Sequence, residues 1–273
     1  MRVGIELEGF VYLNGEPVDV YQWLVCHLGS EEGEINGVLV KTDAGKHMIE
    51  LALPPVEVRD LDHIPEMVYK TMQEFPRNWK FCWQGYDPGN LPAQALWAPK
   101  QRYFAIKRAL QRESPPTWKG VENLSRVASV HVHLDVDFER DGGRVVALLN
   151  TFNNADDLRG KFSTPERVDK WFGWADPRRL PNPPGERRIF GSFQELEEFI
   201  GGIPRLVKQG STGALEPDLK EMSRLGDRLS EGTIWWWARA RRTLRTVEIR
   251  FADSMEPTAI PAYVRELLRR IED

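Results

Sequence analysis

Several segments of this sequence alternate between apolar residues and residues that carry a charge or an imidazole. In the first, Val3–Leu13, Ile5 and Leu7 alternate with Glu6 and Glu8. Successive side chains of a β-strand point to opposite faces, so a period of two gathers residues of one kind on one side. Such a segment is suited to a sheet with one apolar face packed in the core and one face that carries acids.

Three later segments repeat the pattern with other ionisable residues. The polar positions are Glu50 in Met48–Leu53, His131, His133 and Asp135 in Arg126–Phe138, and Glu248 and Arg250 in Leu244–Ala252. Asp43 lies a short distance before the Glu50 segment. If these strands are neighbours, their ionisable side chains converge on one surface of the sheet.

Acids that converge on one surface repel each other unless a counter-ion lies between them. Carboxylates with one imidazole favour Mg²⁺ or Mn²⁺ over a structural zinc, and Mg²⁺ sites often share the metal with substrate phosphates. A solvated sheet face also alternates polar with apolar residues, and this interpretation stays open. It accounts less well for acids and histidines, because Thr, Ser and Lys suit a wet strand face better.

The remaining periodic segments predict a mixed fold. Further strands are expected at Val38–Val40 and Phe81–Trp83, and Asn14-Gly15 predicts a turn. Helices are expected at Pro17–Leu28, Asp60–Phe75, Pro99–Gln111, Arg144–Phe152, Phe193–Ile200, Pro217–Leu229 and Pro261–Ile271. Because strands and helices do not alternate regularly, an α+β fold is favoured. We expect one domain over residues 1–273, with a loop at about 171–190 that is either a lid or a solvated loop.

The composition excludes several classes of protein. The chain has 273 residues, of which 41% are hydrophobic, and a formal net charge of -4. It lacks the basic field of a nonspecific nucleic-acid binder, and no stretch is apolar enough to span a membrane. The acid at position 6 argues against a signal peptide, and two cysteines fit a reducing cytoplasm. A cytoplasmic protein without a nucleic-acid or membrane partner is expected.

Five short stretches occur in the order found in one known family. They are GIELE at Gly4–Glu8, Thr42–Pro55 with its acids and Pro-Pro ending, Arg102-Tyr103, SVHVH at Ser129–His133, and Trp236–Asp253 with WWAR and RTVEIRFAD. In this order they resemble the glutamate–cysteine ligase type of carboxylate–amine ligases, in the glutamine-synthetase-like superfamily. The sequence departs from the family at Ser129, where glycine is frequent, and at Asp43, where many members have glutamate.

The resemblance implies a curved, mainly antiparallel glutamine-synthetase-like sheet with helices packed on its outer face. It also implies that ATP and Mg²⁺, or Mn²⁺ in its place, serve to phosphorylate a carboxylate, for which the γ-carboxylate of glutamate is one candidate. An amine then attacks the acyl phosphate, giving an amide, ADP and phosphate. The partners would be small-molecule carboxylate and amine substrates, and a homo-oligomer would fit because such relatives often assemble.

The resemblance further implies roles for individual residues. The metal ligands would be Glu6, Glu8, Asp43, Glu50, His131 and Glu248. The nucleotide would lie near His133 and Trp237, and Arg250 would act with Glu248 in catalysis by stabilising the transferring phosphoryl group. The substrate would be bound by Arg239, Arg102 and Tyr103. No glycine-rich phosphate-binding loop of the G-x-x-x-x-G-K-[ST] or G-x-G-x-x-G kind occurs, so phosphate would be held through metals and side chains.

Other interpretations stay open at the level of the sequence. The same acids and histidines could serve a metal-dependent hydrolase that works without ATP, although no H-E-x-x-H motif occurs. A non-catalytic ligand-binding relative is the third reading, although it would be expected to lose metal ligands that this chain keeps. The run Trp235–Trp237 could stack on adenine or pack in the core. His27, His47 and His63 are interpreted as core or surface histidines.

Overall fold

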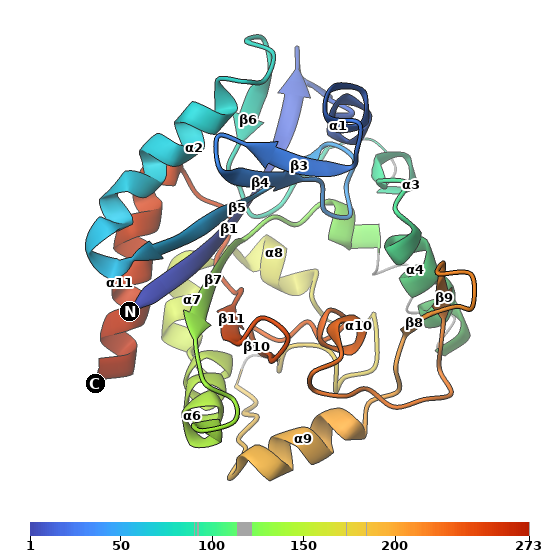
Figure 1. Cartoon of the computed structure of the whole chain (residues 1–273), viewed down its shortest axis with the longest axis vertical. Coiled ribbons are helices and arrows are strands. Elements are labelled where there is room, and N and C mark those ends of the chain that lie inside the picture. The colour runs from blue at the N-terminus through green and yellow to red at the C-terminus, as the bar shows by residue number, and fades with distance from the viewer. Residues whose placement is uncertain (90, 92, 114–121, 173, 184, 273) are drawn as a thin grey trace.

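A mainly antiparallel sheet forms the centre of the molecule (Figure 1). The computed structural model describes residues 1–89, 91, 93–113, 122–172, 174–183 and 185–272. Within them, a nine-stranded sheet runs in the order β10-β11-β7-β1-β5-β4-β3, with β2 and β6 also paired to β1. All of these pairings are antiparallel. The expected α+β class and antiparallel sheet are confirmed.

The strands follow the predicted alternation. Their bounds are Arg2–Leu13 (β1), Glu16–Pro17 (β2), Glu32–Ile35 (β3), Val38–Lys41 (β4), Met48–Glu57 (β5), Lys80–Cys82 (β6), Val130–Asp135 (β7), Val207–Gln209 (β8), Leu215–Pro217 (β9), Ala238–Arg241 (β10) and Thr246–Ile249 (β11). Strands β8 and β9 form a separate two-stranded sheet. The turn after β1 lies where it was predicted, because Asn14 and Gly15 both have positive φ angles, of 53° and 86°.

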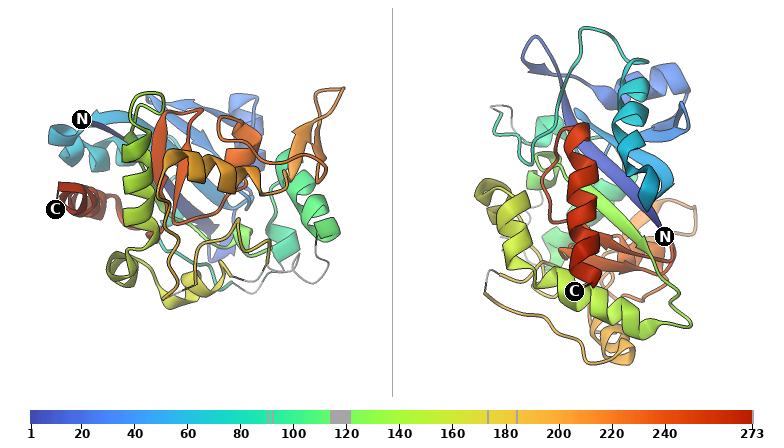
Figure 2. Two further views of the ribbon diagram at one scale, coloured as in Figure 1. Left: turned by 90° about the horizontal axis from the view of Figure 1, so that it is seen from below. Right: turned by 90° about the vertical axis from the view of Figure 1, so that its left-hand side faces the viewer.

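The helices are distributed around this sheet. Their bounds are Val20–Leu28 (α1), Ile64–Met72 (α2), Ala93–Leu96 (α3), Gln101–Glu113 (α4), Gly142–Asn153 (α6), Asp156–Phe162 (α7), Pro165–Asp169 (α8), Phe193–Gly201 (α9), Arg228–Glu231 (α10) and Ile260–Glu272 (α11), with short 3₁₀ turns at Val58–His63, Glu122–Ser125 and Pro257–Ala259. Helices α2 and α11 lie side by side across one face of the sheet (Figure 2). Among the residues that the structure describes, none of these helices combines the length and apolar character needed to span a membrane.

Helix α1 shows how local sequence sets an element. Asp19 caps its start, because the carboxylate accepts a hydrogen bond from the Gln22 N–H at 2.9 Å. The expected start at Pro17 is therefore too early. The helix ends at the predicted residue, because Gly29 adopts the left-handed conformation with φ of 71° and donates its N–H to the Val25 carbonyl.

The helix predicted over Pro217–Leu229 is wrong. Pro217 ends β9, residues 218–227 are irregular, and only the short α10 follows. The carboxylates of Asp218 and Asp227 accept hydrogen bonds from the backbone N–H groups of Lys220 and Leu229. The bond of Asp218 favours a turn over a helix, whereas that of Asp227 caps α10 and so sets the helix start at Arg228, well after the predicted start at Pro217.

The tryptophan run directly precedes β10. Trp235–Trp237 do not lie on a strand, and all three are at most 6% exposed. All three pack in the core, although Trp235 also lines the cavity described below. Trp236 stacks on Phe190 with ring centroids 5.8 Å apart, and Trp235 packs on Trp174 at 4.7 Å.

The loop at about 171–190 is irregular over its described residues, which exclude 173 and 184. It packs tightly in part, since Trp171, Trp174 and Leu180 are at most 5% exposed. The backbone carbonyl of Arg179 accepts a hydrogen bond from the Trp235 N–H at 2.7 Å, which ties the loop to the segment before β10. A lid function for this loop stays a prediction.

Candidate active site

The strand registers place ionisable residues directly opposite each other across the sheet. Glu8 of β1 lies opposite Glu50 of β5, and Glu50 lies opposite Lys41 of β4. Glu6 of β1 lies opposite His131 of β7. Residues that are directly opposite share one face, so these five side chains form adjacent rows on the polar side of the sheet.

A further row crosses the other half of the sheet. His133 of β7 lies opposite Glu248 of β11, and Glu248 lies opposite Arg239 of β10. His133 also lies opposite Gly4 on β1, where an added Cβ would come within 3.2 Å of the His133 Cβ. The glycine of the GIELE motif therefore leaves room for the histidine.

A cavity of about 780 Å³ covers this polar face. Its lining contains two groups of opposite charge. We call the first the acid wall, which comprises Glu6, Glu8, Asp43 and Glu50. The second comprises Arg239, Arg241 and Arg250; together with Glu248, the buried acid that they surround and that is not itself part of the lining, we call it the arginine wall. Helix α4 contributes Arg102 and Tyr103 to the lining, and α10 contributes Arg228.

The acid wall is short of positive charge. Burial, together with the negative charges of Asp43 and Glu50, raises the pKa of Glu8 well above its usual value. Burial likewise raises the pKa of Glu50 to about 7, even though Lys41 Nζ lies 2.9 Å from Glu50 Oε1. The charged forms of Glu8 and Glu50 are therefore poorly stabilised, which leaves room for an additional cation beside them. Glu6 differs, because its bonds to His131 and His133 outweigh burial and hold its pKa well below the usual value.

Two histidines border the acid wall. His131 Nδ1 lies 3.1 Å from Glu6 Oε2, and His133 Nε2 lies 3.6 Å from Glu6 Oε1. Burial and the nearby charge of Arg250 lower the pKa of His131 to about 4, so its ring is neutral near pH 7. Among the described residues, neither Nε2 atom has a hydrogen-bond partner. A neutral, unpaired ring nitrogen is the form of histidine that binds metals.

The arginine wall is built around Glu248, which has no exposed surface. Arg239 donates from Nε and Nη2 to its two oxygens, both at 2.9 Å, and Arg241 Nη1 donates at 2.8 Å. Arg250 Nε lies 3.6 Å away. Burial alone would raise the pKa of Glu248, but these arginines outweigh it and hold the pKa well below its usual range. One carboxylate thus organises three guanidinium groups, which leaves this wall with a positive charge.

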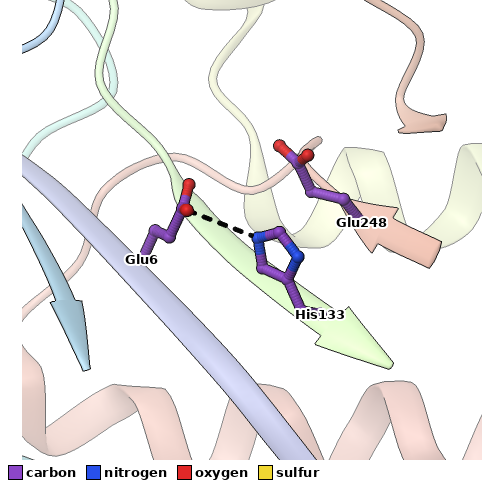
Figure 3. A group of neighbouring side chains, drawn as sticks. All are labelled: Glu6, His133 and Glu248. Carbon is purple, nitrogen blue, oxygen red and sulfur yellow. Dashed lines mark ion pairs between the residues drawn. The ribbon is translucent and has the colours of Figure 1, made fainter. Parts of the chain in front are cut away.

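These residues fit a divalent cation. Carboxylate oxygens and imidazole nitrogens are the ligands that Mg²⁺ and Mn²⁺ accept. Ligand atoms of Glu6, His133 and Glu248 all lie within 4.8 Å of one another, and the three side chains extend from neighbouring strands (Figure 3). Both Glu248 oxygens already accept hydrogen bonds from arginines, however, so the acid wall and the histidines are the better set of donors.

The structure places most of the predicted site residues at this cavity. Tyr103 donates its hydroxyl to the Asp43 carboxylate, and Arg102 Nη2 donates to the Gly232 carbonyl at 2.7 Å. His133, Glu248 and Trp237 lie outside the cavity lining. His133 and Glu248 pair with the lining residues Glu6 and Arg239, whereas the Trp237 ring packs on Trp171 and Phe172. A neighbouring tryptophan, Trp235, lines the cavity in its place.

Sequence reasoning assigned no role to several charged residues of the lining, which are Glu31, Glu32, Lys41, Lys100 and Arg228. It grouped Arg241 with neighbouring arginines that could bind an anionic substrate or phosphate, but it did not predict the strand that places this residue. Lys41 extends the expected strand Val38–Val40 by one residue, so the alternation that pointed to Glu50 would also have placed it. Arg241 alternates with Arg239 on β10, a strand that was not predicted. A charge at every second position of Ala238–Arg241 was the available signal.

Comparisons with known proteins bear on the fold. A scan against models of protein families finds no match for this chain, and a search of curated proteins finds none either. Among solved structures, a bifunctional glutathione synthetase from Pasteurella multocida is similar with a TM-score of 0.51 and 13% identity. Glutamate–cysteine ligase from Francisella tularensis, in complex with AMP, is similar with a TM-score of 0.55 and 10% identity.

Both similarities extend over this whole chain, and the chain spans 39% and 66% of the length of those two proteins. At such low identity the likeness concerns the path of the chain and the arrangement of its strands. The chain therefore has a glutamate–cysteine ligase-like fold of the carboxylate–amine ligase type.

Proposed function

We propose that this protein is an ATP- and divalent-cation-dependent carboxylate–amine ligase. The observation that carries the proposal is one cavity in which the acid wall, with Glu8 and Glu50 at raised pKa values, lies beside the arginines that surround Glu248. Phosphoryl transfer needs mainly positioning and charge neutralisation: cations on the phosphates, and arginines where negative charge develops. The fold supports the proposal, since one of the similar structures is a glutamate–cysteine ligase in complex with AMP.

The acid wall would hold Mg²⁺, or Mn²⁺, through Glu6, Glu8, Asp43 and Glu50, with His131 as a further ligand. A bound divalent cation neutralises the triphosphate and favours transfer of its terminal phosphoryl group. Lys41 keeps Glu50 in place by its 2.9 Å ion pair. The protein would thus supply fixed oxygen and nitrogen donors on a rigid sheet, where little reorganisation is needed.

The arginine wall would receive the negative charge. Arg250 is the one of its three arginines that makes no hydrogen bond to Glu248 within 3.5 Å, so its guanidinium is free to turn toward a phosphoryl group. Arg239 is fixed in a bidentate pair with Glu248 and would present its remaining surface to an anionic substrate. Arg102 and Tyr103 would bind substrate from α4. His133 would lie near the nucleotide.

The γ-carboxylate of glutamate is the first carboxylate to test, and the amine is left to a panel of acceptors that includes ammonia, cysteine and other amino acids. The carboxylate would attack the γ-phosphorus of ATP and release ADP. The amine nitrogen would then attack the acyl phosphate, forming the amide and releasing phosphate and a proton.

Phosphate release with each component left out in turn tests this proposal. We expect release only when ATP, Mg²⁺, a carboxylate and an amine are all present, with an amide product of matching amount by mass spectrometry. Phosphate release without an amine, or no binding of ATP at millimolar nucleotide and Mg²⁺, would contradict a ligase.

A metal-dependent hydrolase is the second candidate, because the neutral ring of His131 borders the acids and, among the described residues, its Nε2 atom has no hydrogen-bond partner. It predicts turnover of an ester, amide or phosphate substrate with Mn²⁺ or Zn²⁺ and without ATP. The same panel, run with metal alone, separates the two functions.

A further inference from the structure

One buried arginine lies outside the residues that the sequence assigned to the site. Arg167 belongs to the short helix α8, and its side chain has no exposed surface. An arginine buried this completely must use its donors inside the protein, because an unsatisfied guanidinium in the core is strongly destabilising. The partners it uses therefore show what it holds in place.

Those partners connect Arg167 with both walls of the cavity, directly with Arg250 and, through Ser129, with Glu8. Arg167 Nη2 donates to the backbone carbonyl of Arg250 at 3.0 Å, and Nη1 donates to the next carbonyl, that of Phe251, at 2.6 Å. Nη2 also donates to the Ser129 hydroxyl at 2.6 Å. One planar guanidinium thus bridges the end of β11, where Arg250 lies, and the entry to β7.

Ser129 extends this bridge to the acid wall. Its backbone N–H donates to Glu8 Oε2 at 2.7 Å, and its carbonyl accepts the Glu8 N–H at 3.0 Å. Arg167 therefore reaches the carboxylate of Glu8 through one residue and the backbone of Arg250 directly. These two residues stand on opposite walls, so the guanidinium fixes the spacing between them.

Arg167 is itself anchored from the far side. Its Nε lies 3.8 Å from Asp253 Oδ1, and the other oxygen of Asp253 accepts the Thr164 N–H at 3.0 Å, directly before α8. Asp253 is the last residue of the RTVEIRFAD stretch, to which no role was assigned. The structure gives it one, since it ties α8 to the strand end that carries Arg250.

We infer that Arg167 is a positioning residue that sets the separation between Glu8 and Arg250, and so between the bound cation and the arginine that meets the phosphoryl group. The inference rests on the proposed function. Arg167 does not line the cavity, so it acts through Ser129 and the Arg250 carbonyl and not on the substrate. Displacement of a reacting group by about 1 Å can cost about 10²-fold in rate.

The test compares Arg167 with a matched buried arginine. Arg159 is 6% exposed and also donates to a backbone carbonyl, that of Asn153 at 3.1 Å, but it makes none of these contacts with either wall. The variants are Arg167→Lys and Arg167→Met, beside Arg159→Lys and Arg159→Met. Unfolding midpoints, kcat, KM for ATP, and Mn²⁺ affinity by electron paramagnetic resonance are measured for all four and for the unchanged protein.

For Arg167→Met we expect kcat to fall about 10²-fold while KM for ATP changes by less than about threefold. Arg167→Lys should recover part of this loss, and Mn²⁺ affinity should fall in the Arg167 variants because Glu8 loses its support. The Arg159 variants should lose stability alone. The inference would be overturned if the Arg167 variants and the Arg159 variants had the same kcat and the same Mn²⁺ affinity.

The kinetic and the Mn²⁺-binding measurements distinguish failure of this inference from failure of the proposed function. If the unchanged protein releases no phosphate with any substrate of the panel, the ligase proposal fails and the Mn²⁺ comparison decides the role of Arg167. If the Met variants do not fold, the Lys variants decide it, since lysine keeps the charge but cannot reach three acceptors at once.

Discussion

The two walls of the cavity differ in how the charges of their buried carboxylates are stabilised. In the arginine wall, Glu248 accepts three hydrogen bonds from Arg239 and Arg241, and its pKa is held well below the usual range. In the acid wall, Glu8 and Glu50 are equally enclosed, yet their pKa values are raised. The carboxylate of the first wall is stabilised without a ligand. In the second wall only Glu6, which is paired with His131 and His133, has a lowered pKa, so Glu8 and Glu50 are the acids that a cation would stabilise.

The largest loss of stability is expected from removing Glu248, the acid of the arginine wall. Glu248→Gln leaves three arginines without their carboxylate in a site with no exposed surface, and breaking a buried pair of this kind costs about 3–5 kcal/mol. Chemical denaturation in the presence of EDTA measures this loss.

Glu8→Gln provides the matched control, since Glu8 is 4% exposed and its amide replacement still accepts the Ser129 N–H. Because burial and neighbouring acids disfavour the Glu8 charge, we expect this variant to be at least as stable as the unchanged protein without metal. A loss of stability as large as that of Glu248→Gln would show that the walls do not differ.

Arg250→Ala tests which arginine acts on the reaction. It removes the guanidinium that makes no close hydrogen bond to Glu248, so the wall should remain folded while the transition state loses a donor. We expect kcat to fall about 10²- to 10³-fold, the range typical of removing one electrostatic donor, with a small change in unfolding midpoint. Phosphate release measures the first and thermal unfolding the second.

Arg228→Ala is the control for this variant, since Arg228 also lines the cavity but lies on α10 and belongs to neither wall. A similar fall in kcat for both variants would indicate that general positive charge, and not the placement of Arg250, supports turnover.

Mg²⁺ is expected to stabilise the folded protein through the acid wall alone. A ligand at 100 times its Kd adds about 2.7 kcal/mol to the free energy of unfolding. This gain should appear in the unchanged protein and shrink strongly in Glu8→Gln, because a neutral amide replaces a charged ligand. Thermal unfolding over a series of Mg²⁺ concentrations, with Ca²⁺ as a comparison, measures it. An equal gain in Glu8→Gln would place the cation elsewhere.

How far the sequence predicted this arrangement depends on the range of the interactions involved. The faces of β1, β5, β7 and β11 were predictable, because a period of two decides which side chains share a side. The pairs Glu8–Glu50 and Glu248–His133 depend on strand register, which is set by residues far apart in the chain.

Other features could not be predicted for the same reason, because they depend on residues far apart in the chain. The short β10 was missed, and with it the position of Arg241 beside Glu248, because a four-residue strand is defined by its pairing partner more than by its own pattern. The hydrogen bonds of Arg167 could not be predicted from the sequence, because its three acceptors lie far from it in the chain, at positions 129, 250 and 251. Such contacts exist only once the strands are assembled.

A second histidine–acid pair, remote from both walls, gives the smallest predicted effect and sharpens the comparison. His47 is fully buried, its Nε2 lies 3.1 Å from Asp87 Oδ2, and its ring stacks on Phe10. Burial alone would raise the pKa of Asp87, but hydrogen bonds from His47, from the Gly89 N–H and from Tyr12 outweigh it and lower the pKa. This cluster resembles the arginine wall, because its charge is already stabilised within the protein.

An acid with a lowered folded-state pKa contributes stability above its unfolded pKa of about 3.9, and that contribution is lost as the pH falls through the folded value. Asp87→Asn should therefore cost about 1–3 kcal/mol near pH 7, and its stability should fall less steeply than that of the unchanged protein below about pH 4. The stabilisation by Mg²⁺ should stay the same, because Asp87 does not line the cavity. Denaturation curves at pH 3 to 7, with and without Mg²⁺, measure both quantities. If Asp87→Asn abolished the effect of Mg²⁺, the cation would depend on acids beyond the acid wall, and the contrast between the walls would no longer explain where it binds.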